Sequence, residues 1–108
     1  MKFDLQGMMA QAQKVQEEME RIKKEVGEKT VTSESGGGMV KVTMTGNNQI
    51  VNLSISKEII DPEDTEMLED LIVAAVNKAN IDAREMVNQE MSKVTGMLPN
   101  IPGLNLGM

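Results

Sequence analysis

Apolar side chains recur at alternating steps of three and four along residues 5–26, which is the spacing of one face of a helix. The series runs without interruption, as in the a/d seam of a coiled coil. A helix of about 22 residues is roughly 33 Å long, about the diameter of a small domain, so a chain of 108 residues cannot easily cover this seam alone. We expect a second copy of the chain to cover it. The seam consists of Leu5, Met8, Ala12, Val15, Met19, Ile22 and Val26.

The predicted first helix spans about residues 4–26. Asp4 is suited to the N-cap, because its carboxylate can accept hydrogen bonds from the free amides of the first turn. Gly27 is suited to the left-handed position that follows a helix. On the exposed face, acidic residues precede basic residues by four positions, which favours ion pairs within the helix and gives these charges a purely structural interpretation. The expected pairs are Glu17 with Arg21 and Glu20 with Lys24.

From residue 28 the pattern changes to that of β-structure, with β-branched residues and a period of two. Strands are predicted at about 28–34, 39–45 and 49–56. Turn residues between them, at 35–38 and 46–48, predict a three-stranded antiparallel meander. One face of this sheet is apolar and the other carries Thr, Ser, Asn and one Lys. The apolar positions are Val40, Val42, Met44, Val51, Leu53 and Ile55.

A second helix is predicted over about residues 62–95. Asp61 and Pro62 form a favourable start, since Asp caps free amides and Pro is preorganised for the first helical position. A broad apolar stripe along this helix must cover the sheet. The fold class is therefore α+β: an α-β-β-β-α chain whose three-stranded antiparallel sheet packs on a long C-terminal helix. Residues 1–108 are expected to form a single domain.

Residues 96–108 form an apolar tail rich in proline and glycine. No charged residue follows Lys93. Pro and Gly disfavour regular structure, whereas large aliphatic side chains favour burial. Two alternatives therefore remain open for the tail, namely docking into a groove of the dimer and disorder. Its aliphatic residues are Leu98, Ile101, Leu104 and Leu106.

The chain lacks Cys, Trp, His and Tyr and has a single Phe. Without Cys there is no disulfide or thiolate zinc site, and without His the commonest general base is missing. We therefore expect no enzymatic activity, no cofactor, no metal and no small-molecule substrate. Single-strand binders usually stack bases on aromatic side chains, so a nucleic-acid partner should be duplex. The sequence shows no secretory h-region and no membrane span, which predicts a cytoplasmic protein without membrane contact.

The net charge of −6 disfavours a nucleic-acid partner unless the charges are unevenly distributed. Residues 57–70 contain one basic and seven acidic residues, and the rest of the chain contains ten of each. A neutral or locally positive face can therefore still meet DNA. The acidic segment also has a structural interpretation, because several of its carboxylates lie where the dipole of the second helix favours negative charge.

Three segments, taken together, resemble one protein family. They are MMAQAQKVQEEMERIKKEV at residues 8–26, VTSESGGGMVKVTMTG at 31–46 and EMLEDLIVAAVNKAN at 66–80. With the Pro/Gly tail they resemble the YbaB/EbfC family of bacterial nucleoid-associated proteins over nearly the whole chain. The resemblance implies a tweezer-like homodimer of α-β-β-β-α subunits. Sheets and second helices would pack at its centre, and the first helices would project as arms.

The resemblance further implies a DNA-binding protein of the bacterial nucleoid that organises the chromosome and influences gene expression. Basic side chains on the arms are expected to contact phosphates of double-stranded DNA, with little readout of base sequence. Family members often carry basic residues entering the third strand, where this chain has residues QIVN at 49–52, so the expected affinity is weak. The candidate DNA-binding residues are Arg21, Lys23, Lys24 and Lys29 near the helix–sheet junction, followed by Lys14 and Lys41.

Two alternative functions remain open. Two helices flanking a β-region also describe a coiled-coil holdase or protein-binding adaptor, and exposed Met side chains suit promiscuous apolar binding. The first helix is, however, short for a prefoldin-like arm, and three strands exceed a hairpin. The second alternative is a structural partner in a DNA-repair or replication assembly that binds protein rather than DNA.

Overall fold

The computed structural model describes residues 4–97, and the side chains of residues 4–94. The predicted α-β-β-β-α order is confirmed, with boundaries that differ from the predictions by at most three residues. The predicted tail begins later than expected, because the second helix continues to Met97. Residues 98–108 lie outside the described part of the chain. The elements are α1 (Leu5–Glu28), β1 (Thr30–Ser35), η1 (Gly36–Gly38), β2 (Val40–Thr45), β3 (Ile50–Ile55), η2 (Lys57–Ile59) and α2 (Thr65–Met97).

The N-terminal cap of α1 is confirmed, since the Gly7 amide donates to Asp4 Oδ1 at 3.0 Å. The prediction for Gly27 is wrong. This residue lies within α1, which continues to Glu28, and it is not among the described glycines with positive φ. Gly27 instead permits close packing, because a Cβ there would lie 2.5 Å from the side-chain oxygen of Asn47.

The start predicted for the second helix is also wrong, by three residues. Asp61 forms a turn rather than a helix cap: its carboxylate accepts from the Glu63 amide at 2.9 Å, and its carbonyl accepts from the Asp64 amide at 3.0 Å. Asp64 then caps α2, accepting from the Met67 amide at 3.3 Å. The helix therefore begins at Thr65, after the turn that contains Pro62.

The sheet is the predicted antiparallel meander, in the order β1-β2-β3. Its register places Ser33 opposite Val42, and Val42 opposite Leu53. A register shift between Thr43 and Met44 makes β3 irregular near its start. Both predicted turns are confirmed: the three glycines of η1 have positive φ, as does Asn48 in the turn between β2 and β3.

The core lies between the sheet and α2. Val40, Val42 and Met44 of β2 are buried against a row of small residues on α2, which permits close approach of the helix to the strand. Ser33 of β1 is also buried, and its hydroxyl donates to Asp82 of α2 at 2.6 Å. The small residues of α2 are Ala75, Ala79 and Ala83.

Helix α2 covers β1 and β2 but not the whole apolar face of the sheet. Leu53, paired with buried Val42, remains 45% exposed, and its neighbours Ile50 and Val51 are also exposed. The prediction that the second helix covers the sheet therefore needs correction. The third strand stands at an edge, with Ile50, Val51 and Leu53 uncovered within the single chain and Ile55 partly buried against the core.

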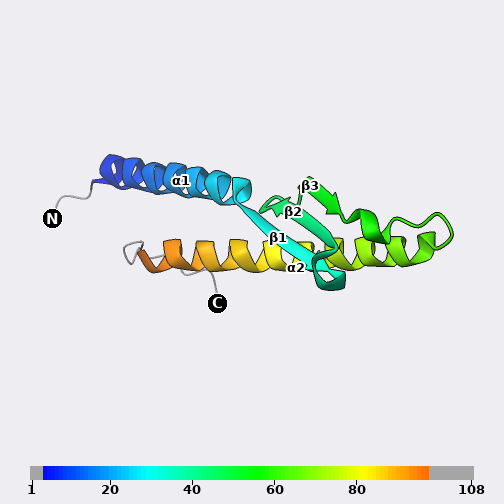
Figure 1. The fold of residues 1–108 in the computed structure, drawn as a ribbon. Coiled ribbons are helices and arrows are strands. Elements are labelled where there is room, and N and C mark those ends of the chain that lie inside the picture. The colour runs from blue at the N-terminus through cyan, green and yellow to red at the C-terminus, as the bar shows by residue number, and fades with distance from the viewer. Residues whose placement is uncertain (1–3, 98–108) are drawn as a thin grey trace.

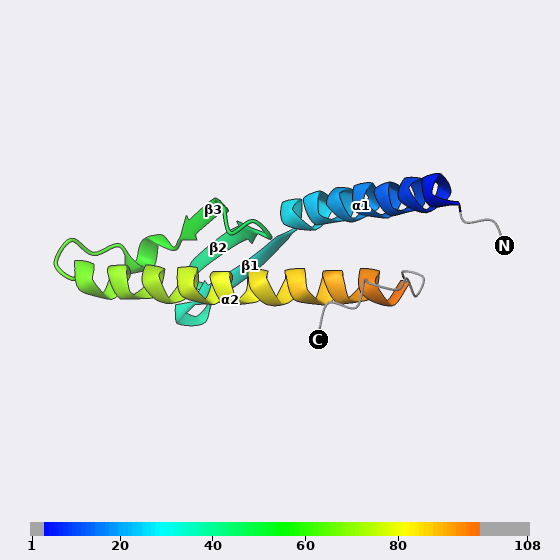
Figure 2. The same cartoon turned by 180° about the vertical axis from the view of Figure 1, so that it is seen from behind.

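The molecule is elongated, with extents of 79 × 22 × 17 Å. Helix α1 and the C-terminal half of α2 both extend beyond the sheet on the same side (Figure 1), and the reverse view in Figure 2 shows the same arrangement. We call these two helical segments the arms. Within residues 4–97, neither α1 nor α2 contains the long, nearly uncharged apolar stretch that a membrane-spanning helix requires.

Candidate nucleic-acid interface

The candidate basic residues fall into four groups by their contacts and positions. Arg21 is held by two carboxylates of its own helix, Glu18 at 2.7 Å and Glu25 at 2.9 Å. These are not the partners predicted from the spacing of four, because the forked guanidinium reaches one acid in each direction along α1. Hydrogen bonding and charge attraction from Arg21 lower the pKa of the Glu18 carboxyl. The charge of Arg21 is thus neutralised locally, which weakens it as a phosphate contact.

Lys29 forms an ion pair between elements. Its ammonium lies 3.0 Å from the Glu90 carboxylate of α2, whose other oxygen lies 3.6 Å from the Lys93 ammonium. The Glu90 side chain is 25% exposed, and the hydrogen bond from Lys29 is the main cause that lowers the pKa of its carboxyl. This three-residue cluster joins the end of α1 to α2 and retains one excess positive charge. Sequence reasoning did not find Glu90, because the partners are distant in the chain.

Three lysines of α1 form no ion pair with the described residues: Lys14, Lys23 and Lys24. The ammonium groups of Lys23 and Lys24 are therefore available for phosphate contacts, whereas the charge of Lys14 also helps to lower the pKa of the Glu18 carboxyl. Helix α1 as a whole carries four basic and five acidic residues, so its binding surface is local rather than a uniformly positive face.

Lys41 lies elsewhere. It is exposed on the polar face of the sheet, opposite Glu34 of β1 and Ser54 of β3. The structure therefore does not bring it together with the lysines of the arms. A position beside an acidic residue on neighbouring strands fits a structural role in the sheet.

The acidic segment lies at the opposite end of the molecule from the tip of α1 (Figure 1). It includes η2, the turn at Asp61 and the first turns of α2. Charge is thus separated along the long axis, and the arms are the less acidic end. Such a separation would orient a polyanion toward the arms, because the interaction energy of charges falls with distance.

The predicted seam of α1 is mostly uncovered in the single chain. Leu5 and Met8 near its N-terminus are 59% and 56% exposed, whereas Val26 at its C-terminal end is 4% exposed. Exposure decreases toward the junction with the sheet, where α1 packs on α2 and on the turn between β2 and β3. Ala12 is exposed as well, and Val15, Met19 and Ile22 are partly buried.

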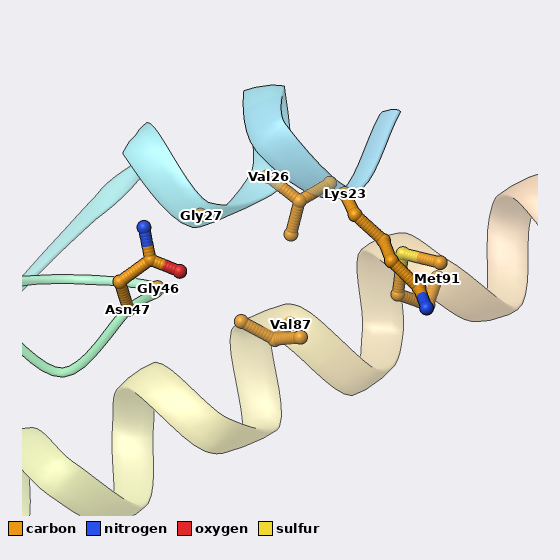
Figure 3. A pocket seen from close by; sticks show the side chains of 7 residues that line it. All are labelled: Lys23, Val26, Gly27, Gly46, Asn47, Val87 and Met91. Atoms are coloured by element: carbon orange, nitrogen blue, oxygen red, sulfur yellow. The ribbon is translucent and has the colours of Figure 1, made fainter. Parts of the chain in front are cut away.

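A small hollow marks this junction. It has a volume of about 250 Å³ and lies between the last turns of α1, the turn between β2 and β3, and the C-terminal half of α2. In Figure 3 the Lys23 side chain reaches from α1 toward Met91 of α2, and Val26 and Val87 lie on the two walls. The remaining lining residues are Gly27, Gly46 and Asn47.

The fold and this arrangement of arms define a class of protein: an α-β-β-β-α chain with a projecting N-terminal helix. A solved structure of an uncharacterized protein from Helicobacter pylori has the same fold, with a TM-score of 0.69 at 23% identity over 88% of this chain and 100% of that one. The family model described as the YbaB/EbfC DNA-binding family matches residues 1–98. The chain belongs to this family.

Curated relatives support the same conclusion. A nucleoid-associated protein of Acetivibrio thermocellus is 50% identical over 101 residues, which are 94% of this chain and 89% of that protein. Another nucleoid-associated protein, from Pelotomaculum thermopropionicum, is 53% identical over 97 residues, 90% of this chain and 91% of the relative. The family resemblance noted in the sequence is thus confirmed.

Proposed function

We propose that this protein binds double-stranded DNA of the bacterial nucleoid as a homodimer, mainly through phosphate contacts, and thereby helps to organise the chromosome and regulate genes. Membership of a DNA-binding family and the names of the relatives support this proposal. The structural observation that carries it is that Lys23 and Lys24 of α1 form no ion pair with a carboxylate of the described residues. We propose no enzymatic activity for this chain.

Phosphate contacts are the appropriate mode for these side chains. Lysine is a point charge on a flexible stem, so it follows a phosphate backbone without demanding a particular base. Lys23 and Lys24 are the first candidates, with Lys14 on the same arm. Arg21 and Lys29 rank lower than the sequence alone indicated, because carboxylates of Glu18, Glu25 and Glu90 already hold them.

The exposed area supports self-association. The chain exposes 8328 Å², whereas a compact monomer of its 11.8 kDa mass would expose about 5,900 Å². This excess of roughly 2,400 Å² per chain is larger than the about 800 Å² that each partner contributes to a standard interface. The uncovered apolar side chains of β3 and the seam of α1 are the two surfaces that a second copy could cover. We place the central contact at β3, since an uncharged apolar edge strand otherwise invites aggregation.

The proposal is tested by the fluorescence anisotropy of a labelled duplex across a salt series, with the dimer concentration known. We expect the logarithm of the affinity to fall linearly with the logarithm of salt, by about 0.9 units for each phosphate contacted. Single-stranded DNA of the same length should bind more weakly. No binding to duplex at low salt would contradict the proposal.

One observation favours a second candidate function. Leu5, Met8 and Met9 are all more than half exposed on one end of α1, as in a surface that binds apolar clients. A holdase or adaptor would suppress the aggregation of a denatured client protein without binding duplex. Suppressed aggregation of a client together with no binding to duplex would favour the holdase or adaptor function over DNA binding.

A further inference from the structure

The hollow at the base of the arms has a mainly apolar lining. Val26, Val87 and Met91 provide its apolar surface, and the two glycines leave it open between the elements. A cavity of about 150 Å³ with an apolar lining holds a benzene-sized molecule, so 250 Å³ accepts one or two aliphatic side chains. Its polar lining residues, Lys23 and Asn47, belong to α1 and to the turn between β2 and β3.

We propose that residues 98–108 of the same chain fold back along α2 and place an aliphatic side chain in this hollow. Nothing in the family assignment or in the proposed DNA contacts requires this interaction. Three features of the chain support this interaction: the apolar hollow, the composition of the segment and the short distance that the segment must span.

The composition fits the hollow. The segment has no charged residue, and it carries large aliphatic side chains that lose free energy when they leave water. Pro99 and Pro102 keep it from continuing the helix, so it would bind as an extended segment. Aliphatic side chains spaced along such a segment can enter a hollow while the backbone stays at its rim. The candidates to enter are Leu98, Ile101, Leu104 and Leu106.

The distance is also suitable. Helix α2 ends at Met97, and the lining residues Met91 and Val87 lie about 9 and 15 Å before this end at 1.5 Å per residue. Seven extended residues span up to about 25 Å, so Leu104 can return to Val87 within its own chain. A segment without charged residues would not compete for the cluster of Lys29, Glu90 and Lys93 on this part of α2.

The chain contains no cysteine, so one cysteine can be introduced for a nitroxide label without background. Leu104→Cys in the full chain is labelled, and the amide signals of the ¹⁵N-labelled protein are compared before and after reduction of the nitroxide. We expect selective loss of the Gly46, Asn47 and Val87 signals in the oxidised sample. The signals of Glu63 and Glu66, at the opposite end of the molecule, should remain, which would exclude general broadening.

Two controls keep the result specific. A matched variant carries the same label together with Leu98→Ser, Ile101→Ser and Leu106→Ser, and it should leave the signals around the hollow intact. In the second control, spin-labelled protein that contains nitrogen at natural isotope abundance is mixed with ¹⁵N-labelled protein that has no cysteine. Broadening in this mixed sample would overturn docking within one chain. In the singly labelled protein, the proposal would also be overturned if the signals around the hollow were not broadened, or if the broadening were centred on β3. The test involves no DNA, so its outcome is independent of the proposed function.

Discussion

At the residue scale, two glycines determine how closely α1 approaches the rest of the chain. A Cβ at Gly46 would lie 2.5 Å from the backbone oxygen of Val26, and a Cβ at Gly27 would meet the side chain of Asn47. The two positions differ in what must move. A backbone carbonyl at the end of a helix is fixed by its neighbours, whereas an exposed asparagine side chain can rotate away.

We therefore predict that Gly46→Ala destabilises the protein by about 1–3 kcal/mol, the usual cost of overpacking. Gly27→Ala should cost less, because alanine stabilises a helix interior by about 1 kcal/mol relative to glycine. Urea unfolding measures both changes. The double variant Gly27→Ala with Asn47→Ala should recover stability relative to Gly27→Ala alone. Equal losses for the two glycine variants would contradict this explanation.

Ser33 forms a second specific contact, because its buried hydroxyl donates to the Asp82 carboxylate at 2.6 Å. Ser33→Ala should lower the free energy of unfolding by about 1.5–3 kcal/mol, the range for hydrogen bonds to charged groups. Thr32→Ala is the matched control, since the exposed Thr32 shares its hydrogen bond only with the hydroxyl of Thr43. A loss of stability that is no larger for Ser33→Ala than for the control would show that the buried bond contributes little.

At the scale of elements, the basic residues of α1 differ in how freely they can contact phosphates. Lys23→Ala with Lys24→Ala should weaken duplex binding similarly for unrelated sequences and reduce the salt slope by up to about 0.9 units per lost contact. Lys57→Ala with Lys78→Ala removes the same charge away from α1 and is the matched control. Unchanged affinity and slope for the first pair would remove these two lysines from the site.

Disrupting the cluster that joins α1 to α2 should strengthen duplex binding rather than weaken it. Glu90→Gln removes the carboxylate that holds Lys29 and Lys93, so both ammonium groups become available and duplex binding should tighten at low salt. Glu66→Gln makes the same change of net charge at the acidic end and should have a smaller effect. Anisotropy titrations of both variants make the comparison. Equal effects would indicate that only net charge matters.

The stabilisation of the folded protein by this cluster depends on pH. The pKa of Glu90 is lowered from 4.5 by its hydrogen bond with Lys29, so the stabilisation is fully present above 4.5 and is lost as the pH falls through the lowered value. Acid should therefore destabilise the wild-type protein more than Glu90→Gln, which lacks this carboxyl. Thermal unfolding above and below pH 4.5 measures the difference. Parallel pH profiles would show that the pair does not affect stability.

At the scale of the whole molecule, the radius of gyration of 20.9 Å exceeds the roughly 13 Å of a compact domain of this length. The extended arms and the uncovered third strand both contribute to this shape. A second copy that covers β3 would bury apolar surface while it leaves the arms projecting, which suits contact with a long polyanion.

We expect sedimentation equilibrium to give the mass of a dimer. Leu53→Lys should dissociate it, because the charge would be placed on the uncovered apolar face. Asn52→Lys is the matched control on the opposite face of the same strand, where its neighbour is Thr43. If Met8→Lys dissociates the dimer and Leu53→Lys does not, the seam of α1 is the interface instead.

Local chemistry in the sequence was sufficient to predict the order of elements. The spacing of three and four indicated α1, the alternation in β2 indicated its buried face, and the glycines at 36–38 and the turn at 46–48 separated the strands, because each of these features depends on near neighbours in the chain. The predictions that were wrong also relied on rules about near neighbours in the chain. Gly27 satisfied the rule for a helix end, but packing against Asn47 explains its presence better.

Only the tertiary structure decided which lysines have carboxylate partners and which apolar surfaces stay uncovered. The pairing of Lys29 with Glu90 joins residues far apart in the chain, and the exposure of Leu53 follows from the position of α2 beneath the first two strands. A sequence pattern specifies which face of an element is apolar, because side-chain direction repeats with the backbone period. It does not specify what covers that face, because coverage depends on where distant elements pack.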